Sequence, residues 1–154
     1  MIQPPHPGKR SIHVPNVGHK APIPLGARVG PLLCSSAIAG KDAATGQLPA
    51  DAATQCANAF ANLDALLTAG GATLGDVAKL SVTIADDSLR DAVNRPWLAR
   101  FPDADDRPAR HIDRKADFMK TGHLPFSIQS ARWPRATARA IAAETCASER
   151  WKLC

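Results

Sequence analysis

The sequence contains no tyrosine, and aromatic residues make up only 5% of it. It also lacks a long apolar segment, since no run approaches the roughly 20 residues that a membrane-spanning helix needs. Residues 1–8 include three prolines and no apolar stretch of the kind found in signal peptides. We therefore expect neither a membrane anchor nor export, and a cytoplasmic location.

Closely paired cysteines are absent as well. The four cysteines are Cys34, Cys56, Cys146 and Cys154, and no two of them form a C-x-x-C pair. The spacing typical of zinc ligands is therefore missing, and we predict neither a metal nor another cofactor. Free thiols are expected where no export signal is found. Cys34 lies in an apolar run and Cys56 on the apolar face of a predicted helix, so both are predicted to be core residues.

Acidic residues are missing from the first 20 positions, which carry Lys9, Arg10 and Lys20. Residues 1–20 therefore have a net charge of +3, and residues 132–154 have a net charge of +3 as well. Because the whole chain has a net charge of +5, residues 21–131 have a net charge of −1. A nucleic-acid-binding domain usually carries its basic residues on the folded body. This distribution makes nucleic acid an unlikely partner, and any such binding would depend on the two ends.

The length of 154 residues suits one domain. The most regular segment is 51–71, where Asp51 is placed to cap a helix and Gly70-Gly71 to end it. Between them the apolar residues recur at helical spacing: Cys56, Ala59, Phe60, Leu63, Leu66 and Leu67. This pattern predicts an amphipathic helix packed on a core.

The other predicted elements are mostly strands, near 11–14 and at 30–38, 79–84, 109–114 and 126–130. A second helix is expected after Asp86 or Asp87, with a kink or a late start because of Pro96. Residues 136–146 are alanine-rich and could form a further helix. The order of elements predicts an α+β domain with two helices packed on one face of a sheet. We expect the other face of the sheet to be covered by oligomerisation.

Several blocks of the sequence resemble, in the right order, motifs of the Rid family (reactive intermediate deaminases, also called YjgF-like). The blocks are Ser36-Ala37-Ile38 through Asp42 and Thr45-Gly46, Gln55 with Asn62-Leu63, Leu66-Leu67 through Gly70-Gly71 with Asp76-Val77 and Lys79, Val93-Asn94 with Trp97 and Phe101, and Arg107-Pro108-Ala109-Arg110. The resemblance covers residues 19–131. It leaves residues 1–18 as an extended N-terminal arm and 132–154 as a basic, alanine-rich C-terminal tail.

The resemblance implies a chorismate-mutase-like fold, in which a mixed β-sheet carries two helices on one face. It also implies a homotrimer with ligand sites in clefts between subunits. Members of the family hydrolyse reactive enamine and imine acids, such as 2-aminoacrylate and its imine tautomer, to a keto acid and ammonia. The implied partner is thus a small ligand that bears a carboxylate, and no cofactor is implied.

The family's carboxylate-binding arginine corresponds to Arg110, and a guanidinium fork fits a carboxylate in a bidentate manner. The alternative for Arg110 is a surface position or a pair with Asp113. Ser36 corresponds to a site serine, with Ala37 beside it, and Asn94 to a helix asparagine near the cleft. Both polar side chains could equally make ordinary structural hydrogen bonds. His111, next to Arg110 on a strand, should face the other way.

Three positions depart from the family pattern. The family's site tyrosine corresponds to Ile23, its site cysteine to Ile112, and its water-assisting glutamate to Gln129. A carboxylate can accept a proton as a general base, whereas an amide can only orient water. The two isoleucines make the cleft more apolar, which would suit a larger or more hydrophobic ligand. His19 and His123 are the candidates to replace the missing base, and Phe118 and Met119 could reshape the cleft.

Three functional hypotheses follow. The first is a hydrolase, an imine deaminase in which Arg110 anchors the carboxylate. Backbone groups near Ala37, with Ser36 and Gln129, would position the attacking water. The second is a non-catalytic carboxylate-binding or regulatory trimer, because Gln129 replaces the glutamate. The third is a nucleic-acid-binding or protein-holding role through the basic ends, which would weaken steeply with salt.

Overall fold

A computed structural model describes residues 8–114 and 126–132. Its seven strands form one sheet in the order β1-β2-β3-β7-β5-β6, with β4 also beside β7. The β5–β6 pair is parallel and the other strand pairs are antiparallel. The strands are β1 Lys9–Ile12, β2 Gly26–Val29, β3 Leu32–Ser35, β4 Ile38–Ala39, β5 Val77–Ile84, β6 Ala109–Arg114 and β7 Phe126–Arg132.

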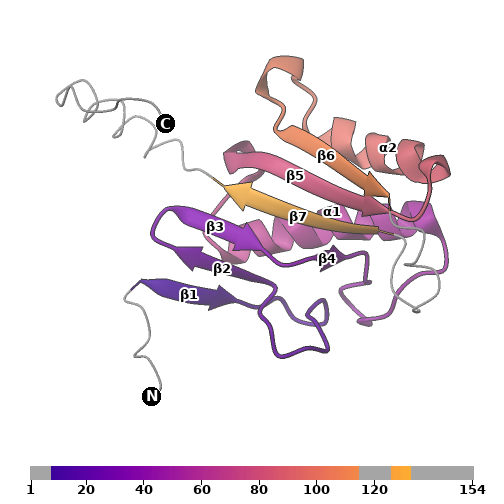
Figure 1. Ribbon diagram of the computed structural model, residues 1–154. Helices are drawn as coiled ribbons and strands as arrows, with labels where there is room; N and C mark the ends of the chain where they lie inside the picture. Colours follow the sequence, from indigo (N-terminus) through magenta and orange to yellow (C-terminus); the bar gives the residue numbers. More distant parts are fainter. Residues whose placement is uncertain (1–7, 115–125, 133–154) are drawn as a thin grey trace.

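Two helices, α1 (Ala52–Ala69) and α2 (Arg90–Arg100), cover one face of this sheet (Figure 1). The predicted α+β architecture, a mixed sheet with two helices on one face, is confirmed. The core lies between the layers, where Leu80, Val82 and Ile84 of β5 are fully buried. Residues that alternate with them, such as Ser81 and Thr83, are only partly buried, as expected for a strand with one apolar face.

Helix α1 follows its sequence pattern closely. The Asp51 carboxylate caps it by accepting a hydrogen bond from the Thr54 backbone N–H at 2.7 Å. The predicted apolar stripe is buried throughout. At the other end, Gly71 takes the left-handed φ of 70°. Arg10 and Arg28 reach from the strands to the carbonyls of Ala69 and Gly70, both at 2.8 Å, and place positive charge at the negative end of the helix dipole.

The apolar run 30–38, predicted as one strand, is divided in the structure. Gly30 has φ 54° and forms the turn of a hairpin between β2 and β3. Strand β2 was not predicted, and only part of the run, Leu32–Ser35, is β3. The predicted strand near 11–14 is displaced toward the N-terminus as β1, which pairs antiparallel with β2.

The prediction that both Cys34 and Cys56 are core residues is wrong for Cys34. Leu33 is fully buried beneath the helices, and its neighbour Cys34 is exposed because successive strand residues face opposite sides. Cys56 is buried on α1, and burial raises the pKa of its thiol to about 11.

Helix α2 begins well before Pro96, so the predicted late start because of this proline is wrong. Asp86 caps a short 3-10 turn, Asp87–Leu89, by accepting from the Ser88 N–H at 2.8 Å, and the α-helix begins only at Arg90. Pro96 then lies inside the helix, which continues to Arg100. Among the described residues, no helix has the length and apolar character that crossing a bilayer requires. The predicted helix at 136–146 lies outside the described residues.

Candidate functional site

The side chain of Arg110 is held between two elements. It projects from β6 toward α2, where its Nη2 donates a hydrogen bond to Oδ1 of Asn94 at 2.9 Å. Its Cζ lies 4.7 Å from the centroid of the Trp97 ring, a cation–π distance. Trp97 is itself buried and packs on Phe101, with ring centroids 4.7 Å apart. The guanidinium is therefore fixed in position on a rigid aromatic platform.

Helix periodicity explains why α2 supplies these contacts. Arg90, Asn94 and Trp97 are separated by four and three residues, so they share one face of the helix. Asn94 was expected to contact the ligand, but its described contact is with Arg110. In the sequence, Trp97 stood out only as part of a family motif, and Arg90 did not stand out at all. The helical spacing of these three residues was the feature of the sequence that could have indicated a common face next to Arg110.

One terminal nitrogen of the Arg110 guanidinium has no hydrogen-bond partner among the described residues. Nη1 is buried and makes no hydrogen bond within the described part of the chain. Burial, and then the charge of Arg90, lowers the pKa of Arg110, but an arginine stays protonated in proteins. A buried cationic donor without an acceptor is costly, so the site favours an anion. The alternative pairing with Asp113 is wrong, because that carboxylate lies 3.0 Å from Nε2 of the exposed His111.

A second group of predicted site residues lies elsewhere on the sheet. Ser36 follows β3, and its Oγ donates to the carbonyl of Pro24 at 2.8 Å, which leaves the oxygen lone pairs of the hydroxyl as acceptors. Ala37 is partly buried beside it. Ile23, in the loop before β2, is 48% exposed. These three residues form a patch near the β3–β4 connection.

One chain does not bring the two groups together. Ser36 lies beside β7, whereas Arg110 and the partly buried Ile112 are on β6. Strands β7 and β5 lie between these two positions in the sheet. Three strand spacings amount to roughly 14 Å. The backbone of Gln129 lies between them on β7, paired with Ser81 and thus in the row of His111. His123, Phe118 and Met119 lie outside the described residues.

His19 is the one described candidate for a replacement base. Its Nε2 is buried without a hydrogen-bond partner in the described ranges. Burial, and then the charge of Lys41, lowers the pKa of the imidazole. A neutral ring can accept a proton, but a lowered pKa makes it a weaker base.

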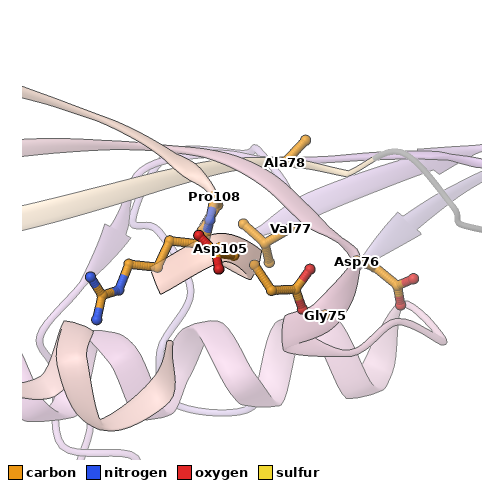
Figure 2. Close-up of a pocket in the computed structure, with 8 residues that line it drawn as sticks. Gly75, Asp76, Val77, Ala78, Asp105 and Pro108 are labelled. Carbon is orange, nitrogen blue, oxygen red and sulfur yellow. The ribbon is translucent and has the colours of Figure 1, made fainter. Parts of the chain in front are cut away.

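Two hollows lie outside this region. One, about 260 Å³, lies below the start of β5 and β6 and is lined by Gly75, Asp76, Val77, Ala78, Asp105, Asp106, Arg107 and Pro108 (Figure 2). Two of its polar side chains make hydrogen bonds to the backbone of nearby loops. Asp76 accepts from the Thr73 N–H at 2.9 Å, and Arg107 donates to the Phe101 carbonyl at 2.8 Å. The other, about 450 Å³, lies between the helices and is lined by Ala53, Thr54, Ala57, Ala92, Arg95, Pro96 and Ala99. Neither hollow is lined by Arg110.

The chain matches the family model described as endoribonuclease L-PSP over residues 24–114, more than half of its length. It belongs to the Rid family. The match includes Ser36, Asn94 and Arg110. A search of curated protein sequences finds no match.

Solved structures of Rid proteins share the fold. The YjgF gene product of E. coli is 25% identical, with a TM-score of 0.72 over 82% of this chain and 99% of that one. RidA from an Antarctic Psychrobacter is 23% identical, with a TM-score of 0.72 over 81% and 99%. E. coli TdcF, solved with bound serine, is 22% identical, with a TM-score of 0.72 over 81% and 98%.

Proposed function

We propose that this Rid protein hydrolyses small enamine and imine carboxylic acids of the 2-aminoacrylate type to a keto acid and ammonia, with Arg110 holding the carboxylate. The observation that carries the proposal is the guanidinium of Arg110, whose Nη2 is fixed by Asn94 while Nη1 is buried without a partner in the described residues. A carboxylate oxygen is an acceptor that suits the unpaired Nη1 of this guanidinium.

The reaction needs little covalent help from the protein. Water attacks the imine carbon, a carbinolamine forms, and the carbon–nitrogen bond breaks as ammonia leaves and the carbonyl of the keto acid forms. The free lone pairs of Ser36 could accept a hydrogen bond from this water, and Gln129 could orient it. Positioning of this kind can supply a large part of a rate enhancement without a strong base.

A homotrimer is part of the proposal. The Arg110 group and the patch of Ile23, Ser36 and Ala37 lie apart in one chain, so a second copy must supply one of them to a shared cleft. The open face of the sheet offers a surface for such an assembly. The amino acid bound to TdcF carries an α-carboxylate, which supports a ligand of this class.

A non-catalytic role in binding small carboxylates is the second candidate. It is favoured by Gln129, which cannot accept a proton usefully, and by the lowered pKa of His19. In this case Arg110 would bind keto acids or amino acids in a saturable manner without turnover. The two candidates share the carboxylate site and differ only in catalysis.

Turnover separates them. An amino-acid oxidase would generate imino acids in the presence of semicarbazide, which traps those that escape hydrolysis. The wild-type chain should lower semicarbazone formation, and Arg110→Ala should not. Arg95→Ala, on the same helix but facing the groove between the helices, is the matched control. If the wild-type chain binds keto acids saturably but does not decrease semicarbazone formation, the non-catalytic binding role is correct and the hydrolase is not.

A further inference from the structure

The groove between α1 and α2 is lined mostly by small side chains. The two helices lie side by side on one face of the sheet (Figure 1). The groove has a volume of about 450 Å³, and three of its alanines are exposed, namely Ala53, Ala57 and Ala99. Helix axes in contact lie roughly 8–10 Å apart, and short side chains permit the closer approach. The groove therefore has the shape to receive a third helix whose own side chains are small.

A salt bridge lies at the end of this groove that is nearer to the C-terminal end of α1. Asp64 follows Ala57 by two helical turns, and Arg100 directly follows Ala99 on α2. Oδ2 of Asp64 accepts from Nε of Arg100 at 3.0 Å, whereas Oδ1 has no hydrogen-bond partner among the described residues. The side chain of Asp64 is 39% exposed. This carboxylate therefore has room for a second cationic donor.

Strand β7 ends close to this carboxylate. Its last residue, Arg132, pairs with Leu33 of β3. Leu33 packs against the end of α1, where an added Cβ on Gly70 would lie only 2.1 Å from its Cδ1. Asp64 precedes Gly70 by six residues, about 9 Å along the helix. Three extended residues span roughly 10 Å, so Arg135 can reach Asp64.

We propose that the residues after β7, 133–154, dock in the groove of their own chain, with the alanine-rich segment 136–146 as a third helix antiparallel to α1. An isolated helix shorter than roughly 12–15 residues is marginal in water, so this segment needs a surface to pack on. Its small residues recur at helical spacing, at Ala136, Ala140 and Ala143.

The charges of the two partners match in this direction. Arg135 meets Asp64 at the end of the groove where the segment enters. Farther along, the exposed Arg95 in the wall of the groove faces Glu144, the one acid of the alanine-rich segment. A helix of the opposite direction would place Glu144 toward Asp64 instead.

The test is intramolecular cross-linking in the full chain. Position 146 lies level with position 53, because each is 11 residues from the Arg135–Asp64 pair. Cys34→Ser and Cys154→Ser leave Cys146 as the reactive thiol, since Cys56 is buried. Ala53→Cys then adds a thiol in the groove. A short bismaleimide should join Cys146 to this thiol at least about tenfold faster than to a control thiol outside the groove, because docking raises the effective concentration.

Ala104→Cys provides the control thiol. Ala104 is exposed and lies next to Asp105, in the wall of the hollow at the start of β5. Because β7 ends beside Val77 of β5, an undocked segment would reach this position at least as easily as the groove.

Two kinds of variant locate the contact. Ala57→Arg fills the groove and should abolish the preference for position 53. Asp64→Asn and Arg135→Gln should each slow this cross-link about two- to fivefold, as an exposed ion pair allows, and the double variant should slow it no further. Thermal melts of each variant verify the fold.

Three results would overturn the proposal. Equal rates at positions 53 and 104 would mean that residues 133–154 do not dock in the groove. A preference that survives Ala57→Arg would place the alanine-rich segment elsewhere. Cross-links that form only between two chains would assign the contact to a neighbouring subunit instead of the same chain.

Discussion

The guanidinium of Arg110 lies over the ring of Trp97, with Cζ 4.7 Å from the ring centroid. This contact and the hydrogen bond to Asn94 orient the one cation that the sequence singled out. Neither contact touches the expected ligand, so each should act on affinity through the position of Arg110.

Replacing Trp97 tests the aromatic platform. Trp97→Phe retains a ring, whereas Trp97→Leu retains apolar volume without the quadrupole that attracts the cation. We expect Trp97→Leu to weaken 2-oxobutanoate binding by about 0.5–2 kcal/mol relative to Trp97→Phe. Thermal melts of both variants report the packing change separately. Equal binding by the two would mean that the ring only fills the core.

Asn94→Asp places a carboxylate where the amide oxygen now accepts from Arg110. An internal carboxylate would pair with the guanidinium and compete with the ligand, so we predict at least tenfold weaker binding while the fold is retained. Asn94→Ala frees Nη2 and should weaken binding less, because a ligand oxygen can take the vacant donor. The reverse order in titration calorimetry would show that Asn94 contacts the ligand itself.

Gln129→Glu restores the carboxylate that the family pattern has at this position. A general base near the attacking water contributes typically 10²–10⁴-fold, so imine hydrolysis should rise by about tenfold or more. The measurement is the semicarbazide competition, and Gln129→Met controls for the loss of the amide. An unchanged rate in Gln129→Glu would place Gln129 away from the reacting water.

Cys56 predicts a pH dependence of stability. Burial raises the pKa of its thiol to about 11 in the fold, from 9.0 for an ordinary cysteine. Above pH 9 the unfolded chain therefore loses its proton first, and stability falls as pH rises toward 11. The loss amounts to about 2–3 kcal/mol. Urea unfolding at pH 8 and pH 11 should show this difference in wild type and not in Cys56→Ala; a parallel decline in both would assign it to other groups.

The layers of the fold could be predicted from local pattern because α1 and β5 each carry one apolar face. Leu80, Val82 and Ile84 alternate, and the α1 stripe recurs at helical spacing. The β2–β3 hairpin could not, because the apolar run 30–38 begins at its turn, Gly30-Pro31, and the four residues of β2, which include Arg28, show no apolar pattern of their own. Cys34 was misplaced for the same reason: a continuous run does not reveal which residues face the helices.

The candidate site likewise has a part that the sequence could predict and a part that it could not. Arg110 was found through a local motif. Its contacts with Asn94 and Trp97 depend on how α2 packs along β6, which no local pattern contains. The pairing of Arg90 and Arg114 with the same carboxylate of Asp87 likewise depends on how the start of α2 packs against the end of β6.

The central claim is that Arg110 holds a carboxylate, and the direct measurement is titration of 2-oxobutanoate into wild type and Arg110→Met. Methionine retains an apolar stem over Trp97 without the charge, and matching thermal melts would confirm an intact fold. We predict saturable binding to wild type and at least tenfold weaker binding to the variant, in line with the roughly 1.5–3 kcal/mol of a hydrogen bond to a charged group. Equal affinities would contradict the account.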